Sequence, residues 1–172
     1  WRKADVGGVT AYLHRADPIA GDGYLVTAQA ADKERLQIHL LTAGLVFADE
    51  PAYDYLRIES GQPRFGRELT QEYIPLEANL WDDVSFKKGC YIGQEIIARL
   101  ESRGKLAKRL ARLALAAPAE PGSDITADGK RAGTLTSVGY GPAGALGLGY
   151  VKTAVLDNNL PLMVGETAVT LL

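Results

Sequence analysis

Residues 124–151 read DITADGKRAGTLTSVGYGPAGALGLGYV, and this stretch decides the fold of the C-terminal part of the chain. Short runs of valine, threonine, leucine and alanine alternate there with glycine and proline, as in β-strands joined by tight turns. The pair Asp128-Gly129 predicts a turn between two of these strands. The same texture reaches the run TAVTLL at residues 167–172. The pattern therefore predicts a small all-β unit, either a barrel or a sandwich.

Helical patterns dominate the sequence before this unit. The run GYLVTA at residues 23–28 predicts a strand. A helix is expected from Asp32, a candidate N-cap, to Gly44, and a second helix from Asp49 to Gly61. The second helix is expected to bury three side chains, those of Tyr53, Leu56 and Ile58.

A third helix is expected at Gln94–Arg103, after a loop without clean periodicity at residues 64–83. Its apolar stripe consists of Ile96, Ile97 and Leu100. Because the strand-like texture begins after this helix, we expect an α+β portion at residues 1–104 and a small antiparallel β-barrel at residues 105–172. A helix through residues 105–117 is the alternative, since the leucine spacing there also permits one.

The composition is that of a globular protein, with 47% hydrophobic and 23% charged residues. No run approaches the roughly 18 apolar residues that a membrane helix requires. The N-terminal sequence lacks the apolar core of a signal peptide and does not begin with Met. We therefore expect a cytoplasmic protein without a membrane partner, and a chain that is processed or a fragment.

The cysteine and histidine counts restrict metal and disulfide chemistry. Cys90 is the single cysteine, which excludes an intrachain disulfide, and there are two histidines. A structural zinc site needs about four such ligands, so none is expected within this chain.

Basic residues concentrate in one part of the sequence. Eight basic and two acidic residues lie from Lys87 to Arg112, although the whole chain has a net charge of −2. The eight are Lys87, Lys88, Arg99, Arg103, Lys105, Lys108, Arg109 and Arg112. Two interpretations remain open: a solvated helix face followed by a strand, or an electrostatic footprint for an anion.

The sequence KKGCYIGQE at residues 87–95 places the cysteine just before the third predicted helix. The free N–H groups at a helix N-terminus and two adjacent lysines both favour a thiolate. Gly89 and Gly93 allow unusual backbone angles and close approach of a ligand. The alternative is an inert buried cysteine, because free cysteine often only fills space in a core. We expect Cys90 to be accessible at the start of the helix.

Four segments, in this order, resemble the YgfZ family of folate-binding proteins. They are RIESGQP at 57–63, GRELT at 66–70, IPLEANL at 74–80 and VSFKKGCYIGQE at 84–95. The run GKRAGTLTSVGYGPAGALGLGYV at 129–151 resembles the final barrel of the same superfamily, which includes the glycine-cleavage T-protein, an aminomethyltransferase.

This resemblance implies a ferredoxin-like α+β portion followed by the barrel, and a chain that corresponds to the C-terminal part of a family member. It also implies tetrahydrofolate, with its polyglutamate tail, as cofactor, and iron–sulfur enzymes, such as tRNA-thiolating enzymes, as partners. The family supports assembly or repair of their clusters. By motif match Cys90 carries the activity. The folate-binding candidates are Lys88, Tyr91, Gln94, Arg57, Glu59, Arg99 and Arg103.

Two other functions remain as alternatives. One is a folate-dependent one-carbon transferase of the aminomethyltransferase kind. The stretch TAQAADKERL at residues 27–36 lacks the acidic motif of that branch, which favours the YgfZ branch. The other is a tRNA-binding module that uses the basic stripe from Arg99 to Arg112.

The basic stripe also suggests a path for the anionic end of the ligand. Arg99 and Arg103 are four residues apart on the predicted helix and so share a face. Arginine grips a carboxylate through two parallel hydrogen bonds. We expect the polyglutamate tail, or a tRNA phosphate in its place, to run along Arg99, Arg103 and Lys105.

Overall fold

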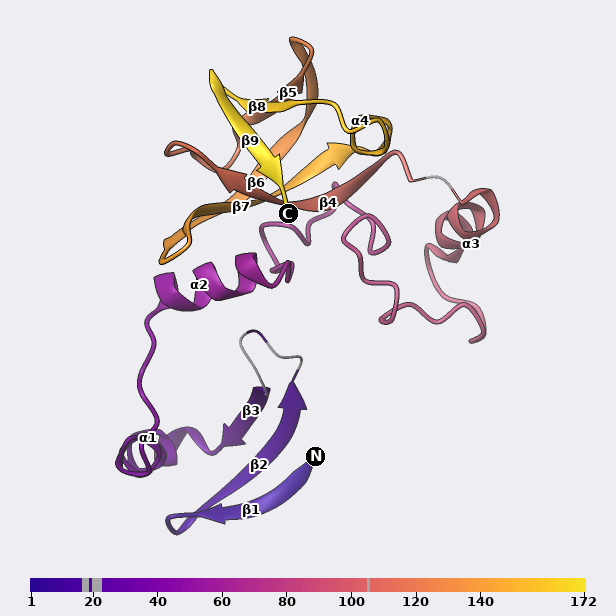
Figure 1. Ribbon diagram of the computed structural model, residues 1–172. Coiled ribbons are helices and arrows are strands. Elements are labelled where there is room, and N and C mark those ends of the chain that lie inside the picture. Colours follow the sequence, from indigo (N-terminus) through magenta and orange to yellow (C-terminus); the bar gives the residue numbers. More distant parts are fainter. Residues whose placement is uncertain (17–18, 20–22, 105) are drawn as a thin grey trace. The chain divides into compact units, whose positions relative to one another are not determined.

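The computed structural model describes residues 1–16, 19, 23–104 and 106–172, without the side chains at 101 and 103. The chain forms two compact units, residues 1–56 and residues 57–172 (Figure 1). Each unit is described by itself.

The first unit contains an antiparallel sheet with the strand order β1-β2-β3. Its strands are β1 (Arg2–Val6), β2 (Val9–Ala16) and β3 (Gly23–Ala28). Gly7 and Gly8 join β1 to β2 with φ angles of 61° and 78°, in the region that suits glycine. The strand predicted at residues 23–28 is confirmed as β3, whereas the preceding hairpin has no counterpart in the sequence-based prediction.

The helices of this part lie where the sequence places them. A short 3-10 turn, η1 (Ala30–Asp32), leads into α1 (Lys33–Thr42), and α2 (Glu50–Glu59) follows. The expected buried face of α2 is wrong at one position, because Tyr53 is 45% exposed while Ile58 is 1% exposed.

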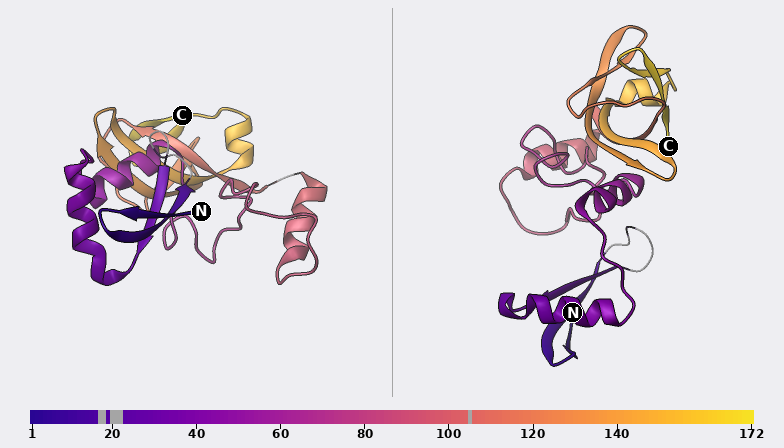
Figure 2. Two further views of the ribbon diagram at one scale, coloured as in Figure 1. Left: turned by 90° about the horizontal axis from the view of Figure 1, so that it is seen from below. Right: turned by 90° about the vertical axis from the view of Figure 1, so that its left-hand side faces the viewer.

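The second unit contains a closed six-stranded barrel with the order β4-β7-β6-β5-β8-β9. The barrel strands are β4 (Lys108–Leu115), β5 (Asp124–Ala127), β6 (Lys130–Gly141), β7 (Gly144–Lys152), β8 (Leu162–Val164) and β9 (Thr167–Leu171), and the helix α4 (Thr153–Asp157) lies between β7 and β8 in the sequence. All the pairings are antiparallel. The strands curve around one another in both views of Figure 2. Because β4 is a strand, the helical alternative for residues 105–117 is wrong.

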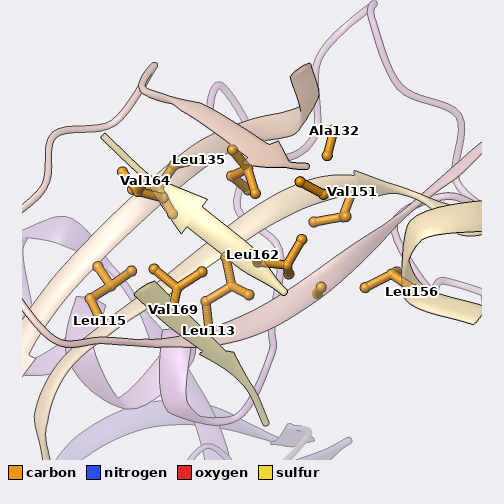
Figure 3. Close-up of a cluster of buried hydrophobic side chains, with 12 residues drawn as sticks. Leu113, Leu115, Ala132, Leu135, Val151, Leu156, Leu162, Val164 and Val169 are labelled. Atoms are coloured by element: carbon orange, nitrogen blue, oxygen red, sulfur yellow. The ribbon is translucent and has the colours of Figure 1, made fainter. Parts of the chain in front are cut away.

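Alternating residues of these strands fill the barrel interior. Leu113, Leu135 and Val151 are fully buried, each from a different strand. Their side chains point toward one another in Figure 3, together with Leu162 and Val169. Burying such a side chain stabilises a fold by about 1.5–3 kcal/mol, so this cluster is the main source of stability in the unit.

Tight turns and glycines close the barrel. Asp128 and Gly129 connect β5 to β6 with φ angles of 49° and 70°, which is the two-residue hairpin turn that the sequence predicts. Gly133 on β6 allows close backbone approach, because a Cβ atom at this position would collide with the carbonyl oxygen of Tyr150 on β7. The glycines among the short apolar runs therefore have a packing role.

The segment before the barrel is part of the same compact unit, which begins at Arg57 rather than near residue 105. Leu76 and Ala78 are buried, and the Leu110 N–H donates to the Glu77 carbonyl over 2.7 Å. The Asn79 side chain donates in turn to the Leu110 carbonyl over 3.0 Å. These bonds attach the loop to β4. The helix α3 (Gln94–Arg103) has the predicted bounds, and the α+β class with an antiparallel barrel is confirmed.

Candidate functional site

The segment around Cys90 folds into a loop that leads into α3. The Tyr91 N–H donates to the Gln94 Oε1 over 3.1 Å, and the Gln94 N–H donates to the Tyr91 carbonyl over 3.3 Å. Between them Gly93 has a φ of 89° and caps the helix. The Gln94 side chain and the positive φ of Gly93 therefore set the course of the chain between Cys90 and the helix.

Cys90 is an exposed free cysteine. It lies four positions before Gln94, the first residue of α3. The predicted accessibility is confirmed, and an inert buried cysteine is excluded. The position suits a sulfur that reacts with, or binds, something outside the chain.

A small cavity of about 190 Å³ lies beside this loop, and it brings together three of the predicted residues: Lys88, Tyr91 and Gln94. The Lys88 Nζ lies 4.7 Å from the centroid of the Tyr91 ring, a cation–π contact. The Lys88 N–H donates to Ser85 Oγ over 3.2 Å. The cavity thus offers a cation, an aromatic face and an amide next to the thiol-bearing loop. These groups can bind a planar ligand with hydrogen-bonding edges or a carboxylate.

Arg57 occupies a buried polar network instead. Its exposed fraction is 2%, and that of Glu68 is 0%. The guanidinium donates to Glu68 Oε2 over 3.0 Å and to Ser137 Oγ over 2.7 Å, while the Ser137 hydroxyl donates to Glu68 Oε1 over 2.6 Å. This placement gives Arg57 a structural role, in which it ties the segment after α2 to β6.

Glu59, two residues further on, is exposed at the C-terminal end of α2. Its carbonyl accepts a hydrogen bond of 2.7 Å from Arg112. Its carboxylate remains a candidate ligand group, in a part of the unit that does not line the cavity beside Cys90.

The basic stripe divides into two parts. Arg99 is exposed on α3, whereas the side chain of Arg103 and the whole of Lys105 lie outside the described residues. The shared face of Arg99 and Arg103 therefore stays a prediction. The barrel members of the stripe contact their own chain: the Lys108 Nζ lies 4.3 Å from the Tyr73 ring centroid, and Arg109 pairs with Asp157 over 2.8 Å.

A tyrosine pair that the sequence patterns do not predict lies beside the buried network. Tyr73 and Tyr150 stack with ring centroids 3.5 Å apart, and the Tyr150 hydroxyl donates to the Glu68 carbonyl over 2.9 Å. Burial, followed by the charges of Tyr73 and Glu68, raises the pKa of Tyr150 above its ordinary value, so its hydroxyl stays protonated. Burial and the neighbouring Glu72 likewise raise the pKa of Tyr73. The sequence gives one indication of this network, because Glu68 lies in the GRELT segment at residues 66–70.

Within the residues that the structure describes, no group of three or more His, Cys, Asp or Glu side chains could hold a metal ion. Over the same residues, no helix has both the length and the apolar character needed to cross a membrane.

Comparison with known proteins finds one family model that matches the barrel. The model of the CAF17 C-terminal β-barrel domain matches residues 108–172, which contain all six barrel strands. A structural comparison finds the glycine cleavage system aminomethyltransferase T of Bartonella henselae, with a TM-score of 0.81 and 22% identity over 94% of this chain and 48% of that chain. This likeness establishes the fold.

Three relatives extend the comparison to the rest of the chain. A putative chloroplastic transferase of Arabidopsis thaliana is 41% identical over 150 residues, covering 86% of this chain and 35% of the relative. An aminomethyltransferase of Rubrobacter xylanophilus is 34% identical over 85% of this chain and 40% of the relative. A tRNA-modifying protein YgfZ of Hamiltonella defensa is 37% identical over 57% of this chain and 29% of the relative. The chain therefore spans less than half the length of these relatives.

Proposed function

The C-terminal domain of this chain belongs to the CAF17 β-barrel family and the chain is related to YgfZ and aminomethyltransferase proteins, and on that premise we propose that it is the C-terminal part of a YgfZ-type tetrahydrofolate-binding protein. In this proposal the full-length cytoplasmic protein supports assembly or repair of clusters in iron–sulfur enzymes, and thereby tRNA modification. Cys90 is its reactive group.

One observation carries this proposal: an exposed thiol stands on a loop whose neighbours Lys88, Tyr91 and Gln94 line one cavity. This arrangement needs no metal ligands from the chain. It suits a folate, because a lysine can attract its carboxylates and an aromatic face can contact a flat ring. The relative named as a tRNA-modifying protein supports the link to tRNA.

Folate binding tests this proposal with Lys88→Gln, a change that removes the cation next to Tyr91 but keeps a side chain of similar length. We expect the Kd of the full-length protein for tetrahydrofolate to rise by about 10-fold, since a lost charge-assisted bond is worth about 1.5–3 kcal/mol. Lys130→Gln is the matched control, because Lys130 is exposed at the start of β6. Equal Kd values for the two variants, measured by fluorescence titration, would exclude a role of this cavity in folate binding.

The basic residues of α3 are tested with a pair of ligands. Replacing Arg99 and Arg103 by alanine is expected to weaken binding of the polyglutamate form more than the monoglutamate, because only the tail adds carboxylates. An equal loss of affinity for both forms would show that the polyglutamate tail does not bind along this helix.

A folate-dependent aminomethyltransferase is the second candidate, and the relative from Rubrobacter xylanophilus favours it. A turnover assay with tetrahydrofolate and an aminomethyl donor separates the two candidates. Turnover that survives replacement of Cys90 would favour the transferase.

A further inference from the structure

Two side-chain-to-backbone hydrogen bonds hold the loop that carries Cys90, one on each side of the thiol. On the N-terminal side, the Lys88 N–H donates to Ser85 Oγ over 3.2 Å. On the C-terminal side, the Tyr91 N–H donates to Gln94 Oε1 over 3.1 Å. Only two residues, one of them Cys90, lie between the two held segments. The course of the chain is therefore fixed close to the sulfur on both sides.

The residues that hold the loop also line the cavity beside it, whereas the thiol does not. Lys88, Tyr91 and Gln94 are among the lining residues, and Cys90 is not. The contact between the Lys88 Nζ and the Tyr91 ring, at 4.7 Å, joins the two held segments across the thiol. Cys90 is exposed, and Ile92 is 104% exposed. The loop thus keeps its cavity-lining side chains in place while the sulfur remains open to solvent.

The start of α3 brings the Gln94 side chain back to the loop. Gly93 precedes the helix with a φ of 89° and, having no side chain, makes no side-chain cap bond. Gln94 is the first helical residue, and its N–H donates to the Tyr91 carbonyl over 3.3 Å. Gln94 and Tyr91 are therefore joined by two hydrogen bonds of opposite direction, one of which uses the Gln94 side chain.

The Gln94 side chain acts on the peptide group next to the thiol. The Tyr91 N–H belongs to the peptide that links Cys90 to Tyr91, so the bond to Gln94 Oε1 fixes the orientation of that peptide. A glutamine side chain has one acceptor oxygen and two N–H donors. Here the oxygen is used within the loop. Among the bonds that hold this loop, it is the one that reaches the residue after Cys90 from the helix.

We infer that Gln94 is a positioning residue for Cys90, which acts by holding the Cys90–Tyr91 peptide through its side-chain oxygen. This inference rests on the proposed function, in which Cys90 is the reactive group. A reactive side chain needs such support, because a displacement of about 1 Å lowers reactivity strongly. Without the bond, the loop between Lys88 and α3 has one restraint fewer, and the thiol samples more positions.

Two substitutions in the full-length protein separate this role from others. Gln94→Met keeps the length of the side chain and loses the amide oxygen, whereas Gln94→Glu keeps an oxygen acceptor and loses the N–H donors. Hydrogen exchange of the Tyr91 amide, followed by NMR with 15N-tyrosine, reports the bond. We expect exchange about 5-fold faster in Gln94→Met, since the bond has a net worth of about 1 kcal/mol, and little change in Gln94→Glu. Equal exchange in Gln94→Met and the unmodified protein would overturn the inference.

Thiolation of tRNA in cells that carry each variant as the only copy reports the consequence for function. We expect Gln94→Met to lower thiolation by up to about 5-fold at equal protein abundance, because fewer molecules have the held loop, and Gln94→Glu to restore it. Ser102→Ala, an exposed position on α3, is the control and should leave thiolation normal. If Gln94 acts instead by donating its N–H groups to a ligand, Gln94→Glu fails as Gln94→Met does, and the inference is wrong.

Cys90→Ser in the same cells separates this inference from the function on which it rests. Loss of thiolation in Cys90→Ser together with normal thiolation in Gln94→Met would contradict the positioning role alone. Normal thiolation in Cys90→Ser would contradict both claims. The Tm of each variant is measured in parallel. If Gln94→Met does not fold, Gln94→Ser takes its place, because the serine side chain is too short to reach the Tyr91 N–H from the helix.

Discussion

At the scale of single residues, Arg57 shows how far a side chain's role depends on distant sequence. Its position at the end of a helix is typical of a residue that compensates the helix dipole, whereas the resemblance to YgfZ proteins implies a folate-binding residue. In the fold it is buried against Glu68 and Ser137, which lie 11 and 80 residues away. No local pattern predicts these partners, because only closure of the barrel brings β6 to the segment after α2.

Removing Arg57 from its ion pair with Glu68 leaves the buried carboxylate of Glu68 without a compensating charge. We expect Arg57→Ala to lower the free energy of unfolding by about 3–5 kcal/mol. Arg131→Ala is the matched control: its pair with Asp124 has side chains 64% and 55% exposed. Such a surface pair contributes about 0–1 kcal/mol. Urea unfolding of both variants measures the difference, and equal losses would contradict a structural role for Arg57.

The pKa of Tyr150 is raised in the folded state, chiefly by burial. This raised pKa predicts that the stability of the fold depends on pH. Above about pH 10 the unfolded chain releases this proton while the folded chain retains it, so stability is complete below that pH and falls above it. At pH 8 we expect Tyr150→Phe to be less stable by about 1 kcal/mol, through loss of the bond to the Glu68 carbonyl.

Phenylalanine does not titrate, so the stability difference between Tyr150→Phe and the unmodified chain should shrink as the pH rises above about 10. Urea unfolding at pH 8 and pH 10.5 measures it. A difference that stays constant between the two pH values would mean that Tyr150 titrates alike in both states.

At the scale of elements, local sequence patterns predict a helix or a turn where the residues of that segment alone determine where it begins and ends. The helix at Gln94–Arg103 and the turn at Asp128-Gly129 follow from apolar spacing and from glycine chemistry. The hairpin of β1 and β2 is different, because its sequences RKADV and VTAYLHRA carry charges on a largely exposed sheet. Such strands lack a clean alternation of apolar and polar residues, so their pairing is not apparent in the sequence.

The glycines of β6 and β7 give a prediction at this scale. Gly133→Ala would place a methyl group against the Tyr150 carbonyl and separate the two strands. We expect a loss of about 1–3 kcal/mol in the free energy of unfolding, the usual cost of overpacking.

Gly89→Ala is the control for this change, because no heavy atom lies within 4 Å of a Cβ there and its φ is not positive. In thermal unfolding, the Tm of Gly133→Ala should be clearly lower than the Tm of Gly89→Ala. A Gly133→Ala variant as stable as Gly89→Ala would mean that β6 and β7 do not approach as closely as described.

At the scale of the whole molecule, the barrel is the part that matches a family model, while the candidate site at Cys90 belongs to the segment before it. The order of the motifs predicts the superfamily of YgfZ and aminomethyltransferase proteins from the sequence, and the fold resembles that of an aminomethyltransferase T with a TM-score of 0.81. The cavity that joins Lys88, Tyr91 and Gln94 depends on how the loop turns at Gly93, which the motif itself suggests.

The most direct test of the central claim measures tRNA thiolation in cells whose only copy of the full-length protein carries Cys90→Ser. Ser102→Ala, an exposed position on α3, is the control. We expect the Cys90→Ser cells to show the thiolation level of cells without the protein, at equal protein abundance, while the control restores normal thiolation. Normal thiolation in the Cys90→Ser cells would contradict the account, because the exposed thiol would then be dispensable.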